Sequence, residues 1–159
     1  MRIIFHPYNP LARPRDQIET WEFIRDQRII ARDTPCQTPY SYYLLLIGYL
    51  SCAESTIIIE QDIVPTREQY DELLICPEPF CVSDYKINVD GKLGSWKELL
   101  SKGNEAHYCL GFSKLPRINP VNTPAISWKN VAYIISQELD KRGFKPHYHS
   151  EVKHNHTYE

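Results

Sequence analysis

Two carboxylates end the most apolar run of the sequence. Residues 56–59 read Thr-Ile-Ile-Ile, then Glu60, Gln61 and Asp62 follow, and Pro65 turns the chain. Consecutive isoleucines are typical of a strand buried on both faces of a largely parallel sheet. An extended chain would point Glu60 and Asp62 to the same side, beyond the carboxyl end of that strand. We predict that they bind Mn²⁺ or Mg²⁺; the alternative is a polar pair that only closes a buried strand.

Histidines near the end of the chain are the expected source of further ligands. His147 and His149 form one pair, and His154 and His156 form another, each with a spacing of two. Both members of such a pair can face one side of an extended segment. We predict that at least one of the four binds the metal, which would favour Mn²⁺ over Mg²⁺. The alternative is a solvated tail whose histidines bind nothing.

The composition is that of an ordinary globular protein. The 159 residues are 42% hydrophobic and carry a formal net charge of −2, with Lys and Arg scattered along the chain. Nucleic-acid-binding proteins normally show a basic patch, so we expect no nucleic acid as a partner. The longest apolar run, residues 42–50, is too short to span a bilayer, and the first residues lack a secretory pattern. We therefore expect a cytoplasmic protein without a membrane span.

The five cysteines include no CxxC pair, so the spacing of a zinc ribbon is absent. Cys76 and Cys81 bracket a proline-rich turn. Nothing nearby in the sequence would lower the pKa of either thiol. We therefore predict packing or a structural bridge at this pair in preference to thiol catalysis.

The order of predicted elements alternates between strands and helices. Residues 66 and 69 form a capping box, Asp90-Gly91 is a hairpin signal, and Ser127 caps the clearest helix, which ends at Gly143. Strands are predicted over 2–5, 56–59, 80–83, 85–89, 92–93 and 106–112, and helices over 15–25, 40–53, 66–75, 95–101 and 127–142, with 144–149 extended. This order predicts one α/β domain over 1–159, with a mixed, mostly parallel sheet flanked by helices.

Several short motifs occur in a consistent order along the chain. They are residues 60–65, the Cys76-to-Cys81 turn, Leu110-Gly111-Phe112-Ser113, the helix that begins at Trp128, and the histidine-rich segment 144–159. In this order the sequence resembles small viral and phage proteins of a minimal GT-A glycosyltransferase type. The resemblance covers most of the chain from Ile3 to His156. It implies a GT-A-like fold, and a location in the host cytoplasm if the protein is viral.

The resemblance also implies a site for a nucleoside-diphosphate sugar. The turn at Pro7, Tyr8 and Asn9 stands where the family holds the nucleoside. Glu60 and Asp62 stand at the family's acidic metal-binding motif, which grips the diphosphate through the cation. His154 stands where a late histidine completes the metal shell, and His156 or His149 could take that role. Asp33, or Arg32 beside it, could contact the donor; a charged residue before a proline-rich loop is more often simply exposed.

The function that the resemblance implies is metal-dependent sugar transfer to an acceptor that the sequence does not identify. One departure bears on catalysis: residues 128–130 read Trp-Lys-Asn, where many family members carry acids. Residues considered as a base are Asp84, Glu105, Glu138 and Asp140. The alternatives are a metal-dependent phosphoester hydrolase and a catalytically inactive relative that binds nucleotide or a partner. Because a domain of this size leaves little room for an acceptor lobe, homo-oligomerisation or a partner protein could complete the site.

Overall fold

A six-stranded mixed sheet organises the chain. The computed structural model describes residues 1–100, 105–120 and 124–155, so His156 lies outside the described residues. The strand order is β2-β1-β3-β8-β5-β9, and β8 alone among these six runs against its neighbours. The predicted mostly parallel α/β sheet is confirmed. The strands span Arg2–Tyr8 (β1), Arg32–Pro35 (β2), Ser55–Ile59 (β3), Cys81–Ser83 (β5), Phe112–Pro116 (β8) and His147–His149 (β9).

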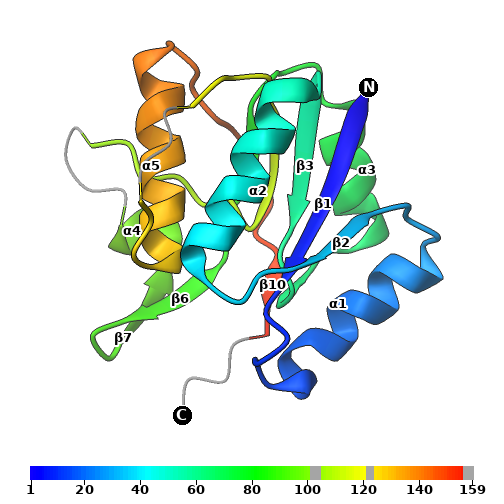
Figure 1. The fold of residues 1–159 in the computed structure, drawn as a ribbon. Helices are drawn as coiled ribbons and strands as arrows, with labels where there is room; N and C mark the ends of the chain where they lie inside the picture. The colour runs from blue at the N-terminus through cyan, green and yellow to red at the C-terminus, as the bar shows by residue number, and fades with distance from the viewer. Residues whose placement is uncertain (101–104, 121–123, 156–159) are drawn as a thin grey trace.

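Helices cover both faces of this sheet. Figure 1 shows α2 and α5 side by side on one face and α3 on the other. Helix α1 joins α3 through a ring contact between Phe23 and Tyr70. No helix among the described residues has the length and apolar character that a membrane crossing requires. The helices span Pro14–Asp26 (α1), Pro39–Cys52 (α2), Arg67–Ile75 (α3), Trp96–Leu99 (α4) and Trp128–Lys141 (α5).

Two small antiparallel pairs lie outside the main sheet. Strand β4, Ile63–Val64, pairs with β10, Lys153–His154, and thereby brings the end of the described chain back to the segment after β3. Strand β6, Lys86–Val89, pairs with β7, Lys92–Ser95. The hairpin between β6 and β7 turns at Asp90 and Gly91, whose φ angles are 52° and 79°. Positive φ at both central residues is what a two-residue hairpin requires, so the predicted turn is confirmed.

The order of the parallel strands creates a switch point. The chain leaves β1 for β2 on one side and then returns past β1 to enter β3 on its other side. Strands β1, β2 and β3 are parallel, so their carboxyl ends lie at one edge of the sheet. Ligands of open α/β sheets bind in the crevice at such a point, because the loops from the two strands diverge there.

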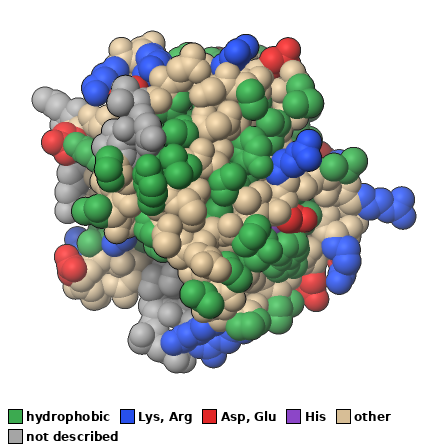
Figure 2. Space-filling view, viewed as in Figure 1, with side chains coloured by type: hydrophobic (Ala, Val, Ile, Leu, Met, Phe, Trp, Pro, Cys, Tyr) green, Lys and Arg blue, Asp and Glu red, His purple; other side chains and the backbone are tan. Residues whose placement is uncertain are grey.

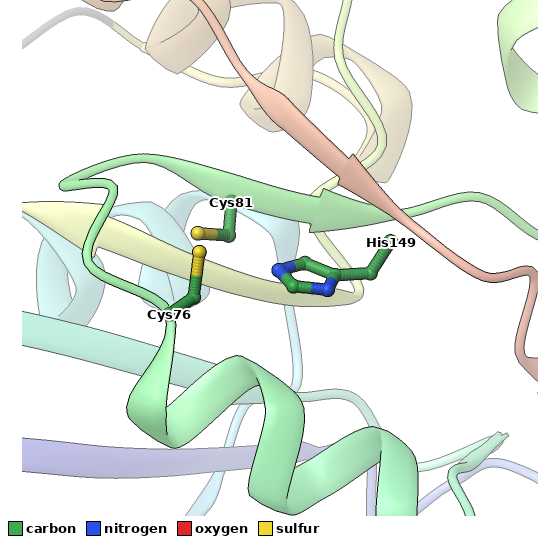
Figure 3. A group of neighbouring side chains, drawn as sticks. All are labelled: Cys76, Cys81 and His149. Atoms are coloured by element: carbon green, nitrogen blue, oxygen red, sulfur yellow. The ribbon is translucent and has the colours of Figure 1, made fainter.

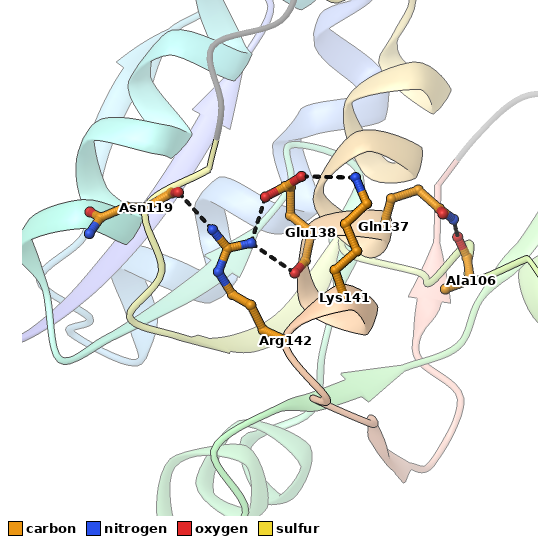
Figure 4. Close-up of polar contacts among 6 residues, drawn as sticks. All are labelled: Ala106, Asn119, Gln137, Glu138, Lys141 and Arg142. Carbon is orange, nitrogen blue, oxygen red and sulfur yellow. Dashed lines mark hydrogen bonds and ion pairs between the residues drawn. The ribbon is translucent and has the colours of Figure 1, made fainter.

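The capping signals were read correctly, but one predicted strand was wrong. Thr66 and Gln69 form the reciprocal capping box, and the Ser127 hydroxyl accepts a hydrogen bond from Asn130 N at 3.1 Å. The strand predicted over 106–112 is irregular up to Gly111, and β8 begins only at Phe112. Side chains of α5 take the place of a neighbouring strand there: Gln137 donates to Ala106 O at 2.6 Å (Figure 4), and Ser136 accepts from Tyr108 N at 2.7 Å.

Strand β3 is the centre of the core. Ile57, Ile58 and Ile59 are fully buried, as the run of isoleucines predicted. The strand lies between β1 and β8, and its first residues are covered by α2. Its position in the middle of the sheet explains why β-branched residues occupy both faces, since neither face meets water.

Replacing Ile58 by Ala should therefore destabilise the fold strongly. The change removes buried methyl groups and leaves a cavity in the middle of the sheet, so we expect a loss of about 2–5 kcal/mol in the free energy of unfolding. Ile30→Ala is the matched control, because Ile30 is 93% exposed, and it should change stability by less than about 0.5 kcal/mol. Urea denaturation measures both. Equal losses in the two variants would contradict the central position of β3.

Candidate functional site

A cavity of about 700 Å³ opens at the switch point, beyond the carboxyl ends of β1 and β3. The topology explains its lining, since β1, β3 and β5 end at this edge and β8 begins there. The loop before β8, the start of α5 and strand β10 complete the wall. The lining includes Pro7, Tyr8, Asn9, Cys36, Tyr42, Glu60, Gln61, Asp62, Tyr85, Trp96, Gly111, Ser127, Trp128, Lys129 and His154.

Asp62 and His154 form a polar pair in this cavity. Antiparallel pairing places His154 opposite Ile63, next to the aspartate, and His154 Nε2 lies 3.2 Å from Asp62 Oδ2. The other ring nitrogen, Nδ1, lies 2.6 Å from Lys86 O and so carries the proton of the neutral ring. Burial alone would lower the pKa of His154, but the hydrogen bond to Asp62 and the charge of that carboxylate raise it overall.

Glu60 lies in a different environment from Asp62. Its Oε1 accepts a hydrogen bond from Tyr42 Oη at 3.1 Å, and Tyr85 is a second hydroxyl donor. Burial, followed by repulsion from Asp62, raises the pKa of Glu60 to about 7 although both tyrosines stabilise its charged form. Gly111 makes room for this arrangement, because a Cβ there would lie 2.8 Å from Glu60 Oε2 and 2.7 Å from Tyr85 Oη.

The premise that residues 60–62 are extended was wrong. They form a turn closed by a hydrogen bond from Ile63 N to Glu60 O at 3.1 Å. The turn is needed because the chain must leave β3 and enter β4 to pair with β10. Both carboxylates still line the cavity, but Glu60 contacts tyrosines while Asp62 contacts His154.

The predicted nucleoside turn and the acidic motif contact each other directly. Asn9 N donates a hydrogen bond to Gln61 Oε1, and Gln17 Nε2 donates to Asn9 O at 3.1 Å. On the other side, Cys36 N donates to Tyr8 O at 2.7 Å and so extends the pairing of β1 with β2. The structure thus places Pro7, Tyr8 and Asn9 beside Glu60 and Asp62, although 52 residues separate Asn9 from Gln61.

Two of the predicted ligands suit a divalent cation well. Asp62 Oδ2 and His154 Nε2 present an oxygen and a nitrogen to the same space, and Mn²⁺ accepts both kinds of ligand. One carboxylate and one imidazole are sufficient where phosphate oxygens and water supply the remaining positions. Glu60 does not converge with them: over the described ranges, the only three Asp, Glu, His or Cys side chains whose ligand atoms cluster within 4.8 Å lie elsewhere.

Sequence reasoning missed the part of the site that α5 contributes. Ser127, Trp128 and Lys129 line the cavity at the beginning of this helix. Its first amide groups and the Lys129 side chain are suited to an anion such as a diphosphate. Trp128 is 44% exposed and lies against the Tyr42 ring, with centroids 5.9 Å apart. The Ser127 cap was visible in the sequence, but nothing showed that this helix begins at the same sheet edge as Glu60.

The other candidate residues lie away from the cavity. Asp33 is exposed on β2, beside His6 in register, and is not among the lining residues. Glu105 is exposed, and Asp84 instead accepts from Tyr85 N at 2.9 Å. Glu138 accepts from Arg142 Nη1 at 2.5 Å in a group with Lys141 and Asn119 (Figure 4), and Asp140 pairs with Lys145. Within the described chain, Glu60 and Asp62 are therefore the only carboxylates lining the cavity.

The charge distribution on the drawn face agrees with the scattered basic residues of the sequence. Figure 2 shows Lys and Arg side chains mainly around the margin of that face, with hydrophobic side chains between them. The chain's 18 basic and 20 acidic residues give a net charge of −2. Lys129 is the one Lys or Arg among the described residues that line the cavity.

The raised pKa of Glu60 predicts a specific pH dependence of stability. Between its ordinary value of 4.5 and about 7, the folded protein holds a proton on Glu60 that the unfolded chain has lost. The free energy of unfolding should therefore fall as pH rises through this range, by up to about 3 kcal/mol from this group. Glu60→Gln keeps an oxygen for Tyr42 and removes the titration.

Urea denaturation of the wild type and Glu60→Gln between pH 4.5 and 8 measures this effect. The variant should gain stability over the wild type as pH rises. His154 also loses stabilising charge above pH 6.5, because its pKa is raised. The larger part of that effect comes from Asp62 and is present in both proteins, whereas the smaller part that the charge of Glu60 supplies is present in the wild type alone. Parallel curves for the two proteins would show that Glu60 titrates normally.

The cavity thus combines an aspartate–histidine pair, a carboxylate held by two tyrosines, and the start of a helix with an exposed lysine. No family model, curated protein or solved structure matches the chain. The function is therefore inferred from the side chains of the cavity and from the strand order that brings them together.

Proposed function

We propose that this protein is a metal-dependent glycosyltransferase of the GT-A type that uses a nucleoside-diphosphate sugar. One observation carries the proposal: the turn at residues 7–9, the acidic turn at 60–62, His154 and the start of α5 all line one cavity at the switch point of the sheet. The first three are also the positions that the resemblance to the GT-A family implies for nucleoside and metal binding. Their convergence, together with a cationic helix start, supports a donor site.

The cavity offers a complementary group for each part of the donor. Tyr8 and the turn at Asn9 lie where a nucleoside would rest against the ends of β1 and β2. Lys129 and the amides at the start of α5 would hold the diphosphate. Asp62 and His154 would hold Mn²⁺ or Mg²⁺, and the imidazole favours Mn²⁺. Trp128, exposed at the rim, offers a flat apolar surface to a sugar ring.

We propose Glu60 as the general base. Its pKa of about 7 allows it to accept a proton at neutral pH, whereas an ordinary carboxylate would be a weaker base. In an inverting transfer, the acceptor oxygen forms a bond to the anomeric carbon and gives its proton to Glu60. The bond from that carbon to the diphosphate breaks, and the nucleoside diphosphate leaves with the electron pair. The bound cation would stabilise the charge on that leaving group.

The two alternative functions differ in what the cavity must supply. A phosphoester hydrolase with two metal ions needs two sets of ligands close together. The described lining residues supply one set, Asp62 and His154, and Glu60 is already held by Tyr42 and Tyr85. A catalytically inactive relative would keep the donor site and lack a base. A base at Glu60 would therefore distinguish an active enzyme from such a relative.

The donor site predicts metal-dependent stabilisation by nucleoside diphosphates. In a panel of these ligands with and without Mn²⁺, one nucleotide should raise the melting temperature of the wild type only with the metal. A ligand at 100 times its dissociation constant adds about 2.7 kcal/mol to the free energy of unfolding. Asp62→Asn should abolish the shift because it removes the charged ligand. Asp33→Asn should keep it, since Asp33 lies outside the cavity. No shift with any nucleotide, or equal loss in both variants, would refute the donor site.

Turnover separates the three functions once a nucleotide is identified. A glycosyltransferase should release that nucleoside diphosphate from its sugar conjugate, by transfer or slow hydrolysis. Glu60→Gln should retain nucleotide binding and lose most of the turnover, on the order of 10²-fold for a missing general base. Nucleotide binding with no turnover would indicate the inactive relative. Cleavage of a simple phosphoester without any sugar nucleotide would indicate the hydrolase.

A further inference from the structure

A second group of metal-ligating side chains lies on the sheet at the side of α3. Cys76 is the residue at which α3 ends, Cys81 opens β5, and His149 ends β9. One ligand atom from each lies within 4.8 Å of the others. Figure 3 shows the two sulfurs next to each other and one ring nitrogen of His149 pointing towards them.

The sheet register explains why these side chains meet. Strands β5 and β9 are parallel, with Cys81 opposite His147 and Ser83 opposite His149. Residues 81, 83, 147 and 149 therefore project from the same face. Helix α3 contacts β8 and β9, so Cys76, the C-cap residue that follows Ile75, lies near that face. The proline-rich turn after α3 then returns the chain to Cys81.

The donor set and its spacing suit a tetrahedral zinc ion. Zn–S bonds of about 2.3 Å and Zn–N bonds of about 2.0–2.1 Å place tetrahedral ligand atoms roughly 3.5–3.8 Å apart. Atoms that already lie within 4.8 Å of one another reach this spacing by side-chain adjustments of about 1 Å or less. Two thiolates and an imidazole are soft or intermediate ligands, which select Zn²⁺ over Mg²⁺ or Mn²⁺.

The orientation of His149 is an independent observation that points to a ligand. Its Nε2 atom is buried and has no hydrogen-bond partner. Its Nδ1 atom faces a carboxylate, with Glu72 Oε2 at 3.8 Å. A histidine that binds a metal through one nitrogen commonly turns the other towards a carboxylate. An unpartnered buried nitrogen costs free energy, which a metal bond would recover.

Neighbouring groups fix the positions of the two cysteines. The contacts of their sulfur atoms are weaker than bonds to a metal ion would be. The buried Lys114 donates from Nζ to Cys76 O at 2.5 Å and so fixes the end of α3. Cys81 Sγ makes weak thiol contacts with Glu78 O at 3.5 Å and with the Cys76 side chain. Both cysteines are free thiols in this structure, so the structural bridge considered from the sequence is not a disulfide here.

We propose that Cys76, Cys81 and His149 bind one Zn²⁺ ion, with water as the fourth ligand. The ion would link the end of α3 to β5 and β9, which are neighbouring strands at one edge of the sheet. The chain that follows β9 carries His154, and Gln69 of α3 already holds that segment by donating to Glu151 O at 2.9 Å. The zinc ion would therefore fix the segment that delivers His154 to the cavity. The proposal does not depend on the proposed transferase function.

Metal titration of the reduced, chelator-treated full chain tests the site. Zn²⁺ should bind with one high-affinity equivalent, and Co²⁺ as a spectroscopic substitute should give thiolate charge-transfer and tetrahedral d–d absorption bands. Cys76→Ser and Cys81→Ser should each lose these bands, and His149→Gln should weaken Zn²⁺ affinity at least about 10-fold. Cys52→Ser is the matched control, because Cys52 is an exposed cysteine outside the group, and it should bind as the wild type does.

A measurement on the wild type alone keeps the test valid if a variant fails to fold. Cys76 is partly exposed and Cys52 is exposed, so both should react with an alkylating reagent in the metal-free protein. Zn²⁺ should protect Cys76 and leave Cys52 reactive, as mass spectrometry of the labelled peptides would show. Equal labelling of Cys76 with and without Zn²⁺, or Co²⁺ bands that survive in Cys76→Ser, would overturn the proposal.

Discussion

The parallel pairing of β1 with β3 is the constraint on which the site depends. Its register places Phe5 opposite Ile58, so β1 continues for two residues, Pro7 and Tyr8, beyond the level at which β3 ends. Pairing continues past the end of β3, since Glu60 N donates to Gly111 O at 2.9 Å. The fully buried side chains of Ile57, Ile58 and Ile59 pack tightly into the core on both faces of the sheet, which holds this register. The relative positions of Asn9, Glu60 and Gly111 therefore follow from packing in the core.

A second constraint brings the end of the described chain to the same place. The two-residue pairing of β4 with β10 is short, but it joins residues that are 92 positions apart, Asp62 and His154. Asn155 N also donates to Asp62 O at 2.7 Å, so the turn after β3 and the segment after β9 hold each other. Lys153 adds a contact with Glu19 of α1 at 2.5 Å; both side chains are about half exposed, so this ion pair contributes little stability.

The sequence predicted those features whose cause is local. The Thr66 box, the Ser127 cap and the Asp90-Gly91 turn depend on residues within a few positions of one another, and each was read correctly. The buried strand at 57–59 was also predictable, because its composition reflects burial on both faces. The irregular path of residues 106–111 was not, since its backbone groups bond to side chains of α5 that lie about thirty positions further on.

Some residues of the site were predictable from the sequence, but the residues that contact them were not. Asp62 and His154 were named as ligands and do meet, whereas Asp33 was named from its charge alone and lies outside the cavity. Tyr42 and Tyr85 gave no signal, because a tyrosine in an apolar segment is usually a core residue. Cys76, Cys81 and His149 come together because of the register between β5 and β9 and the position at which α3 ends. The spacing of these residues in the sequence indicates neither feature.

Residue type and spacing did not distinguish the roles of two neighbouring carboxylates. The sequence presents Glu60 and Asp62 as equivalent ligands. The turn at 60–63 separates them: Asp62 contacts His154, while Glu60 is buried between two hydroxyl groups with its pKa raised to about 7. After burial, the charge of Asp62 is a further cause of that raised pKa of Glu60, because like charges repel at short range. One backbone turn therefore gives two neighbouring acids different partners and different environments.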